Sequence, residues 1–440
     1  MMQPRASMFG GSWINGDDAG SRYANVAYNW PENSNDNLGA RGRSDDLTRM
    51  FARRRSRSRR RITFSQGWWS AHLSCFGEYT SRSGRAGRSG RNPAAVETRG
   101  RFTRENAMTK RYRNLIGKIT SPRNMEAALR LTAAGKRLTP GYLDFKEFSA
   151  LNLADLAREM ADGSYIPGEP HQFHVFDPKK RLISALPFRD RIAQQALCLV
   201  IAPIFDRALL PRSFACRPGK GTHAGVMQLQ SELRRFGDRP LYFLKTDFSA
   251  YFASIERPVL WRLIDAKISC RATLRLVQAM VPREGIGLPI GSLTSQIFAN
   301  LYTGATLDRH LQQTLGERLW YRYMDDLVVL GTSSAHLARV KTSIEEFSKH
   351  HLGLRFSKWQ IASVSRGINF LGYRIWASHK LLRKDSVTRA RRKIAAYRAA
   401  GDHERLRKFL VAWLGHARWA DSANLIRSLG IAVMRKGSSA

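Results

Sequence analysis

Cysteine is scarce in this chain, and its placement excludes two kinds of site. Four cysteines are scattered over 440 residues without CxxC spacing, at Cys75, Cys198, Cys216 and Cys270. This pattern forms neither a disulfide framework nor a zinc site, and it predicts small core residues in a reducing interior. Long apolar runs are also missing, since none approaches the roughly 20 residues needed to cross a bilayer. The sequence shows no charged-then-apolar signal segment. We therefore expect a cytoplasmic protein with no membrane partner.

Acidic residues are few relative to basic ones. The chain has 35 Asp and Glu against 73 Lys and Arg, which gives a formal net charge of +38 at pH 7. A surface of this charge attracts phosphate backbones and makes binding strongly salt-dependent. Membrane-surface binding would also need an amphipathic basic helix and an anchor. The charge therefore favours a nucleic-acid partner.

Lysine is absent from the first part of the chain, where every basic residue is Arg until Lys110. Residues 53–61 are an Arg-rich run, and residues 81–91 are a low-complexity segment with no apolar period, which predicts disorder. From Met108 the composition becomes that of a globular protein. Helical periodicity covers residues 124–163 and 189–210, and residues 165–175 and 181–186 are predicted strands.

Three acidic residues follow or separate apolar strands. Asp325 and Asp326 lie in a tight turn between the apolar runs 319–321 and 327–330, and Asp247 ends the apolar run 241–247. An isolated Asp-Asp pair in a hairpin is usually a solvated turn. Here the ordered segments 248–252 and 287–296 accompany it, which a solvated hairpin does not need. Carboxylates on neighbouring strands suit two hard cations about 4 Å apart that activate a hydroxyl and hold a leaving pyrophosphate.

These ordered elements resemble the palm motifs of reverse transcriptases over about residues 112–431. The third palm motif is similar to that of the reverse transcriptases of diversity-generating retroelements. That family has an aliphatic residue, Gly, three residues and Ser-Gln, which here are Ile290, Gly291, the next three residues, Ser295 and Gln296. The chain departs from the family at Ser292, where Asn is usual.

The resemblance implies an α+β right-hand polymerase fold. We expect fingers over residues 108–236, a palm of antiparallel sheet plus helices over 237–378 and a helical thumb over 379–440. The N-terminal extension, residues 1–107, is expected to be disordered or spurious. Its first part, 1–48, looks like a template repeat, because a Gly-Gly-Ser-Trp segment precedes many Asn residues. Residues 49–107 are Arg-rich and of low complexity. We expect 1–107 to be template repeat and spacer read in frame, with a true start at about Met108. A binding module or an Arg-rich RNA-binding tail is the alternative.

The resemblance also implies roles for individual residues. Two Mg²⁺ ions would be held by the carboxylates of Asp247, Asp325 and Asp326 and by the Phe248 carbonyl. Phe252 would exclude a 2′ hydroxyl, although a core aromatic is the alternative. Lys358 would be a general acid at the pyrophosphate, in a Phe-Ser-Lys segment where the family has Asn-Pro-Lys. The remaining predicted nucleotide contacts are Arg181, Arg217, Lys220, Ile290, Gly291 and Gln296. Predicted primer and template contacts are Tyr323, Met324, Gly367, Phe370, Leu371 and Gly372. Any one of the cations could instead be a solvated surface charge.

The function that the resemblance implies is error-prone, RNA-directed DNA synthesis. A template-repeat RNA would be copied from a primer into cDNA with deoxynucleoside triphosphates and with errors opposite adenine, and the cDNA would replace part of a target gene. A small, basic, oligomeric accessory protein and a bacterial or phage-infected cell are expected. The alternatives are a group II intron-like, retron-like or phage-defence reverse transcriptase, or an inactive palm that binds RNA.

Overall fold

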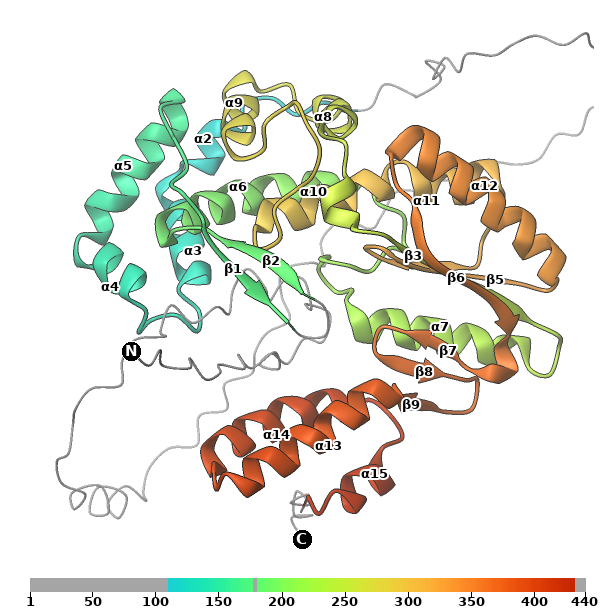
Figure 1. Ribbon diagram of the computed structural model, residues 1–440. Helices are drawn as coiled ribbons and strands as arrows, with labels where there is room; N and C mark the ends of the chain where they lie inside the picture. Colours follow the sequence, from blue (N-terminus) through green and yellow to red (C-terminus); the bar gives the residue numbers. More distant parts are fainter. Residues whose placement is uncertain (1–109, 177–179, 432–440) are drawn as a thin grey trace, which may run out of the picture. The chain divides into compact units, whose positions relative to one another are not determined.

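The computed structural model describes residues 110–176 and 180–431 (Figure 1). The predictions for residues 1–107 lie outside this part of the chain. The described residues combine helices with three antiparallel sheets, so the predicted α+β class is confirmed. No helix in these ranges is both long enough and apolar enough to span a bilayer.

A four-stranded antiparallel sheet in the order β4-β5-β3-β6 carries the predicted carboxylates. Its strands are β3 (Tyr242–Phe248), β4 (Trp320–Tyr323), β5 (Asp326–Gly331) and β6 (Phe356–Ser363). The middle of β5 and all of β4 are buried, as expected for apolar runs covered on both faces. Helix α12 (Ser334–Leu352) packs on β3, β5 and β6, and α7 (Thr222–Phe236) contacts β4. Figure 1 shows the sheet between these two helices.

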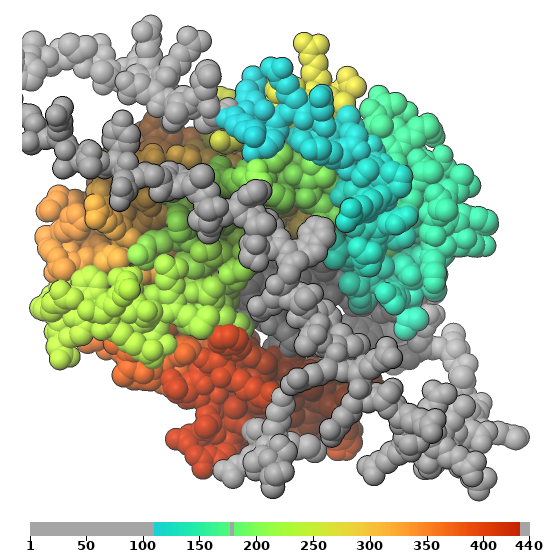
Figure 2. Space-filling view, turned by 180° about the vertical axis from the view of Figure 1, so that it is seen from behind, coloured from blue at the N-terminus to red at the C-terminus, as the bar shows by residue number. Residues whose placement is uncertain are grey.

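The region before this sheet is organised around α6 (Phe188–Asp206), which is buried along most of its length. Helix α6 packs against α3 (Pro122–Thr132), α4 (Pro140–Glu147) and α10 (Leu293–Gly304). Figure 2 shows the helices of residues 116–162 gathered on one face, in cyan to blue-green. Helices α2 (Ile116–Ile119) and α5 (Ser149–Asp162) also precede the sheet, whereas α8 (Arg257–Asp265) and α9 (Arg271–Met280) follow β3 in the chain.

The predicted strand over residues 165–175 is only partly correct. Strand β1 (His171–Val175) pairs with β2 (Arg181–Ala185), whereas residues 165–170 are not in a strand. The Tyr165 hydroxyl and the Gly168 amide instead donate hydrogen bonds of 2.8 and 2.9 Å to the Asp190 carboxylate. A carboxylate on α6 thus accepts the hydrogen bonds of this segment in place of a partner strand. The alternation of apolar and polar residues that predicts a strand gives no information about such a distant acceptor. Likewise, the helical pattern over 124–163 is divided among α3, α4 and α5.

The last part of the described chain has a small sheet and three helices. Strands β7 (Ile368–Phe370), β8 (Tyr373–Ile375) and β9 (Lys380–Leu382) form an antiparallel sheet. Helices α13 (Lys384–Ala399), α14 (His403–Ala417) and α15 (Ala423–Ser428) follow. The Tyr373 hydroxyl lies 2.9 Å from His416 Nδ1 and 3.0 Å from the His416 carbonyl oxygen, so it links the small sheet to α14.

Candidate active site

The three predicted carboxylates lie at one end of the four-stranded sheet. Asp247 on β3 is the Cα partner of Asp326 on β5, and directly opposed residues project to the same face of a sheet. Asp325 lies in the turn between β4 and β5, next to Met324, whose φ of 53° is left-handed. The register of the sheet shifts between Asp247 and Phe248, and such bulges can redirect a side chain at a functional site.

Electrostatics show that these carboxylates act on one another. Burial, followed by the charges of Asp247 and Asp326, raises the pKa of Asp325 to about 7, and the charge of Arg181 opposes this rise. Burial also raises the pKa of Asp326, against the opposing charge of Lys245. A divalent cation would relieve this repulsion, and carboxylate and carbonyl oxygens are the ligands that Mg²⁺ prefers. The residues therefore fit the predicted metal in their chemistry.

Lys245 is a site residue that the sequence analysis missed. It forms an ion pair with Asp326, and its ammonium lies 5.9 Å from the centre of the Phe370 ring.

Over residues 110–176 and 180–431, no group of three or more His, Cys, Asp or Glu side chains is arranged to hold a metal. Since Asp326 is paired with Lys245, Asp247 and Asp325 are the stronger candidates for direct ligands, and Asp326 suits a supporting position.

Two residues of β6 lie beside Asp247. Lys358 is the Cα partner of Asp247 across the β3–β6 pair and is exposed, so it projects to the face that carries the carboxylates. The Ser357 hydroxyl lies 3.2 Å from the Asp247 carboxylate and 3.1 Å from its carbonyl oxygen. Ser357 stands where the related family has Pro, which has no hydroxyl to donate. This departure therefore adds a polar contact to the predicted ligand.

The predicted phosphate-binding cations are engaged with protein groups. The Arg217 guanidinium bonds to the Asp206 carboxylate and, at 2.6 and 2.9 Å, to the carbonyls of Leu210 and Ser213. Lys220 donates a 2.9 Å hydrogen bond to the Pro211 carbonyl, and burial, followed by the charge of Arg217, lowers its pKa. These bonds fix the loop before α7. A triphosphate would have to displace protein acceptors to bind Arg217, whereas the Lys220 ammonium has further N–H groups besides the one bonded to Pro211.

The predicted third motif forms a loop that is tied on two sides. The Leu288 amide donates to the Phe252 carbonyl, and the Ser184 amide of β2 donates to the Ile290 carbonyl, each at 2.8 Å. Phe252 is 6% exposed, in the short 3₁₀ segment Tyr251–Ser254 after β3. The motif thus lies between β2 and the segment that follows β3. Ile290 is bonded there through its backbone only, because its side chain is apolar.

Gln194 on α6 is the second residue that the sequence analysis missed. Its amide nitrogen donates to the Ser292 hydroxyl at 2.8 Å, and its amide oxygen accepts from the Leu293 amide at 3.1 Å. Ser292 is buried and is the position where the chain departs from the related family. Gln296, one helical turn further, is buried with its amide oxygen 3.5 Å from Cys216 Sγ. The only sequence signal for Gln194 was its polar side chain in a buried helix.

Four of the predicted primer and template contacts lie in or next to the β7–β8 hairpin, and the other two lie at the carboxylate turn. Leu371 and Gly372 form its turn, with φ of 52° and 89°, and Phe370 is buried beneath Lys245. Gly367, at φ 73°, precedes β7 and lies against the Trp376 ring. Tyr323 and Met324 are buried at the carboxylate turn. Phe370 therefore lies near the carboxylate end of the sheet, because Lys245 contacts both its ring and Asp326. The roles of all six residues in binding primer or template remain predictions.

Part of the chain, which includes this site, is similar to known proteins. Residues 175–375 match the family described as reverse transcriptase (RNA-dependent DNA polymerase). The chain is 24% identical over 329 residues to Protein YkfC of Escherichia coli (strain K12), and this alignment covers 63% of this chain and 84% of YkfC. It is 23% identical over 179 residues to the group II intron-encoded protein LtrA of Lactococcus lactis subsp. cremoris, which covers 37% of this chain and 29% of LtrA.

Apo telomerase from Candida tropicalis is among the similar solved structures, with 10% identity and a TM-score of 0.40 over 56% of this chain and 54% of that chain. The family match includes β2, the loop before α7, the third motif, all four strands of the central sheet and the β7–β8 hairpin. Residues 175–375 therefore form a reverse transcriptase domain, and the chain is by class an RNA-directed DNA polymerase.

Proposed function

We propose that this reverse transcriptase belongs to a diversity-generating retroelement. In this role it copies a template-repeat RNA into cDNA with frequent errors opposite adenine, in the cytoplasm of a bacterial or phage-infected cell. The observation that carries the proposal is Ile290 in the third motif, followed by Gly291 and by Ser295-Gln296. The loop that holds Ile290 is bonded to the backbone of Phe252 on one side and of Ser184 on the other. Ile290 stands where the resemblance to accurate reverse transcriptases implies Gln, so an apolar side chain replaces an amide in this loop.

The proposed division into subdomains assigns fingers to residues 108–236, palm to 237–378 and thumb to 379–440. All strands of the four-stranded sheet fall within the palm range. Helices α13 and α14 carry many of the basic residues of the thumb range, which suits contact with the phosphates of a duplex. Template RNA, primer and cDNA would bind along these parts, and a small basic accessory protein is the further partner we expect.

In the proposed mechanism, Asp247, Asp325 and the Phe248 carbonyl would hold two Mg²⁺ ions, and Asp326 would support them. Bound Mg²⁺ supplies charge that lowers the barrier to attack of the primer hydroxyl on the nucleotide. Arg181, whose charge opposes the rise in the pKa of Asp325, would bind a phosphate beside the metals. Lys358, opposite Asp247, would give a proton to the leaving pyrophosphate. The Phe252 ring would lie beneath the sugar and exclude a 2′ hydroxyl.

Replacing Ile290 with Gln tests the proposed source of the errors. We expect fewer misincorporations opposite template adenine and a smaller change opposite the other bases, because an amide restores a polar contact near the nucleotide. A change of about 10-fold corresponds to about 1.4 kcal/mol, which is within the roughly 0.5–1.5 kcal/mol that one hydrogen bond contributes. The measurement is sequencing of cDNA made on an adenine-rich template RNA.

Ile290→Leu is the matched control, because it conserves volume without an amide and should keep the adenine errors. If Ile290→Gln stays active with the same adenine error frequency, Ile290 is not their source. If the unaltered enzyme shows no excess of errors at adenine, the retroelement proposal itself fails.

Replacing Gly291 with Ala should damage nucleotide use through the position of this loop. A Cβ at residue 291 would lie 2.6 Å from the Ser184 carbonyl oxygen, and the φ of 116° disfavours any side chain. Because a shift of about 1 Å can cost about 10²-fold in rate, we expect kcat/KM for nucleotides to fall by about that factor. Single-nucleotide incorporation kinetics measure it.

Gly316→Ala is the matched control for backbone strain, since Gly316 has a φ of 71° and open space where a Cβ would lie. It should lower stability and leave kcat/KM close to that of the unaltered protein. Equal kinetics for Gly291→Ala and Gly316→Ala would show that the contact with Ser184 does not position the loop.

A group II intron-like role is the second candidate, because LtrA is described as a group II intron-encoded protein. The two roles differ in what flanks the gene. A near-repeat that differs from a second copy only at adenines supports the retroelement role, whereas a flanking group II intron RNA supports the second.

A further inference from the structure

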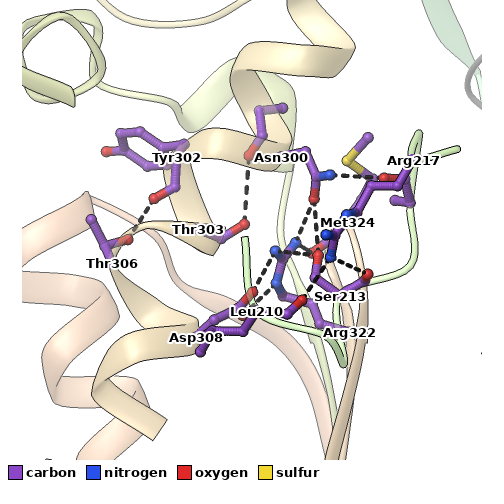
Figure 3. Close-up of polar contacts among 12 residues, drawn as sticks. Leu210, Ser213, Arg217, Asn300, Tyr302, Thr303, Thr306, Asp308, Arg322 and Met324 are labelled. Atoms are coloured by element: carbon purple, nitrogen blue, oxygen red, sulfur yellow. Dashed lines mark hydrogen bonds and ion pairs between the residues drawn. The ribbon is translucent and has the colours of Figure 1, made fainter. Parts of the chain in front are cut away.

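Arg322 is a fully buried charge directly behind the carboxylate turn. It belongs to β4, has 0% exposed side-chain area and forms a two-pronged ion pair with Asp308 of α11 (Leu307–Arg309). The Nε and Nη2 atoms lie 2.6 and 2.7 Å from the two Asp308 oxygens, and Asp308 is also fully buried. Figure 3 shows this pair beneath the turn. A bidentate arrangement of this kind fixes the guanidinium plane as well as its position.

The same guanidinium reaches three further elements. Nη2 donates to the Ser213 hydroxyl at 2.9 Å, and Nη1 donates to the Asn300 amide oxygen at 3.3 Å and to the Met324 carbonyl at 3.2 Å. Asn300 in turn donates a 2.7 Å hydrogen bond to the Ala215 carbonyl. The contacts therefore join the loop before α7, helix α10 and the carboxylate turn, as the dashed lines of Figure 3 show.

The contact with Met324 bears directly on Asp325. Met324 adopts a left-handed φ of 53°, which is unfavourable for a residue with a Cβ and persists only when surrounding contacts maintain it. The Met324 carbonyl belongs to the peptide plane that also contains the Asp325 amide. A donor that holds this carbonyl therefore sets the direction in which the Asp325 side chain leaves the turn.

We propose that Arg322, held by Asp308, is the positioning residue of the carboxylate turn and couples its geometry to the loop before α7. Arg322 acts through Met324 and does not itself touch nucleotide or metal. The inference rests on the proposed role of Asp325 as a metal ligand. It predicts that weakening Arg322 changes how the turn binds divalent cation without changing how the protein binds template and primer.

Arg322→Lys tests this, because a lysine retains the charge that Asp308 needs but cannot bond to Asp308 and to the Met324 carbonyl in the same geometry. We expect kcat to fall by about 10²-fold, because a shift of about 1 Å in the position of Asp325 can cost that factor in rate. The dissociation constant for Mn²⁺, followed by electron paramagnetic resonance without nucleotide, should rise several-fold. The dissociation constant for primed template RNA should stay unchanged.

Tyr302→Phe is the matched control. Tyr302 is buried on α10. Its hydroxyl donates a 2.8 Å hydrogen bond to the Leu352 carbonyl and accepts a 3.4 Å hydrogen bond from the Glu256 amide, so the substitution removes buried hydrogen bonds without touching the turn. It should lower the melting temperature and leave kcat and Mn²⁺ binding near their original values. The proposal is overturned if Arg322→Lys is folded and matches Tyr302→Phe in both quantities.

Ser213→Ala keeps the proposal testable if Arg322→Lys does not fold. It removes one acceptor of the guanidinium and should raise the Mn²⁺ dissociation constant by a smaller factor than Arg322→Lys, with template binding unchanged. An unchanged Mn²⁺ constant for Ser213→Ala would then overturn the proposal. Full activity of an Asp325→Ala variant would instead remove the proposed metal site, which is a separate outcome.

Discussion

Asp325→Ala is expected to abolish Mg²⁺-dependent cDNA synthesis on a primed RNA template. Loss of a metal ligand removes several kcal/mol of transition-state stabilisation, so the rate should fall by about 10³-fold or more. The folded state should survive, because Asp247 and Asp326 no longer repel a third carboxylate. Primer extension with labelled nucleotide measures the rate, and the melting temperature without Mg²⁺ should stay constant or rise.

Asp265→Ala is a suitable control, since Asp265 is partly exposed on α8 and pairs with Arg283 at 2.8 Å outside the carboxylate site. This variant should lose a little stability and keep its activity. Near-normal extension by Asp325→Ala would show that the turn does not hold the catalytic metals, whatever the melting temperature.

The elements that carry the site could be predicted because each is encoded locally. Apolar runs on both sides of Asp325 and Asp326 specify two strands and a turn, and the structure has β4 and β5 there. The turn consists of Met324 and Asp325, whereas Asp326, which was also predicted in the turn, is the first residue of β5. The apolar run that ends in Asp247 is β3. Pairing of β3 with β5 then brings the carboxylates together. This pairing is expected once both apolar strands are buried in the same hydrophobic core.

The residues that support the site could not be predicted, because their contacts join distant parts of the chain. Lys245 meets Asp326 across the sheet, and Gln194 meets Ser292 at a separation of 98 residues. Arg322 meets Ser213 at a separation of 109 residues. A polar side chain within an apolar helical pattern was the one sequence signal for Gln194, and it does not name the partner. Only the packing of α6 against α10 gives its side chain a partner.

Arg217 shows what a local motif leaves open. The sequence predicts a planar fork for phosphate oxygens, whereas the structure places this fork on Asp206 and two backbone carbonyls. A local pattern cannot indicate whether a guanidinium faces solvent or its own loop. The phosphate role of Arg217 therefore remains a prediction.

Phe252→Ala should let ribonucleotides compete with deoxynucleotides. Phe252 is buried next to Tyr251, with ring centres 5.6 Å apart, and its carbonyl accepts from Leu288 of the third motif. Truncation keeps this backbone bond and removes only the ring, which opens space where a 2′ hydroxyl would lie. A steric contact of this size contributes about 1–3 kcal/mol to discrimination, so the deoxy-to-ribo ratio of kcat/KM should fall by about 10- to 100-fold.

Tyr251→Phe separates sugar selection from loss of packing around Phe252. The Tyr251 hydroxyl lies 2.6 Å from the Ala299 carbonyl and 2.9 Å from the Thr303 hydroxyl, so removing it weakens the same 3₁₀ segment while the Phe252 ring remains. This variant should have a lower melting temperature and an unchanged deoxy-to-ribo ratio. If Phe252→Ala also leaves the ratio unchanged while it remains folded and active, Phe252 is a core aromatic. Sugar discrimination must then depend on another side chain, because the cavity left by the Phe252 ring would not have been enough to admit a ribonucleotide.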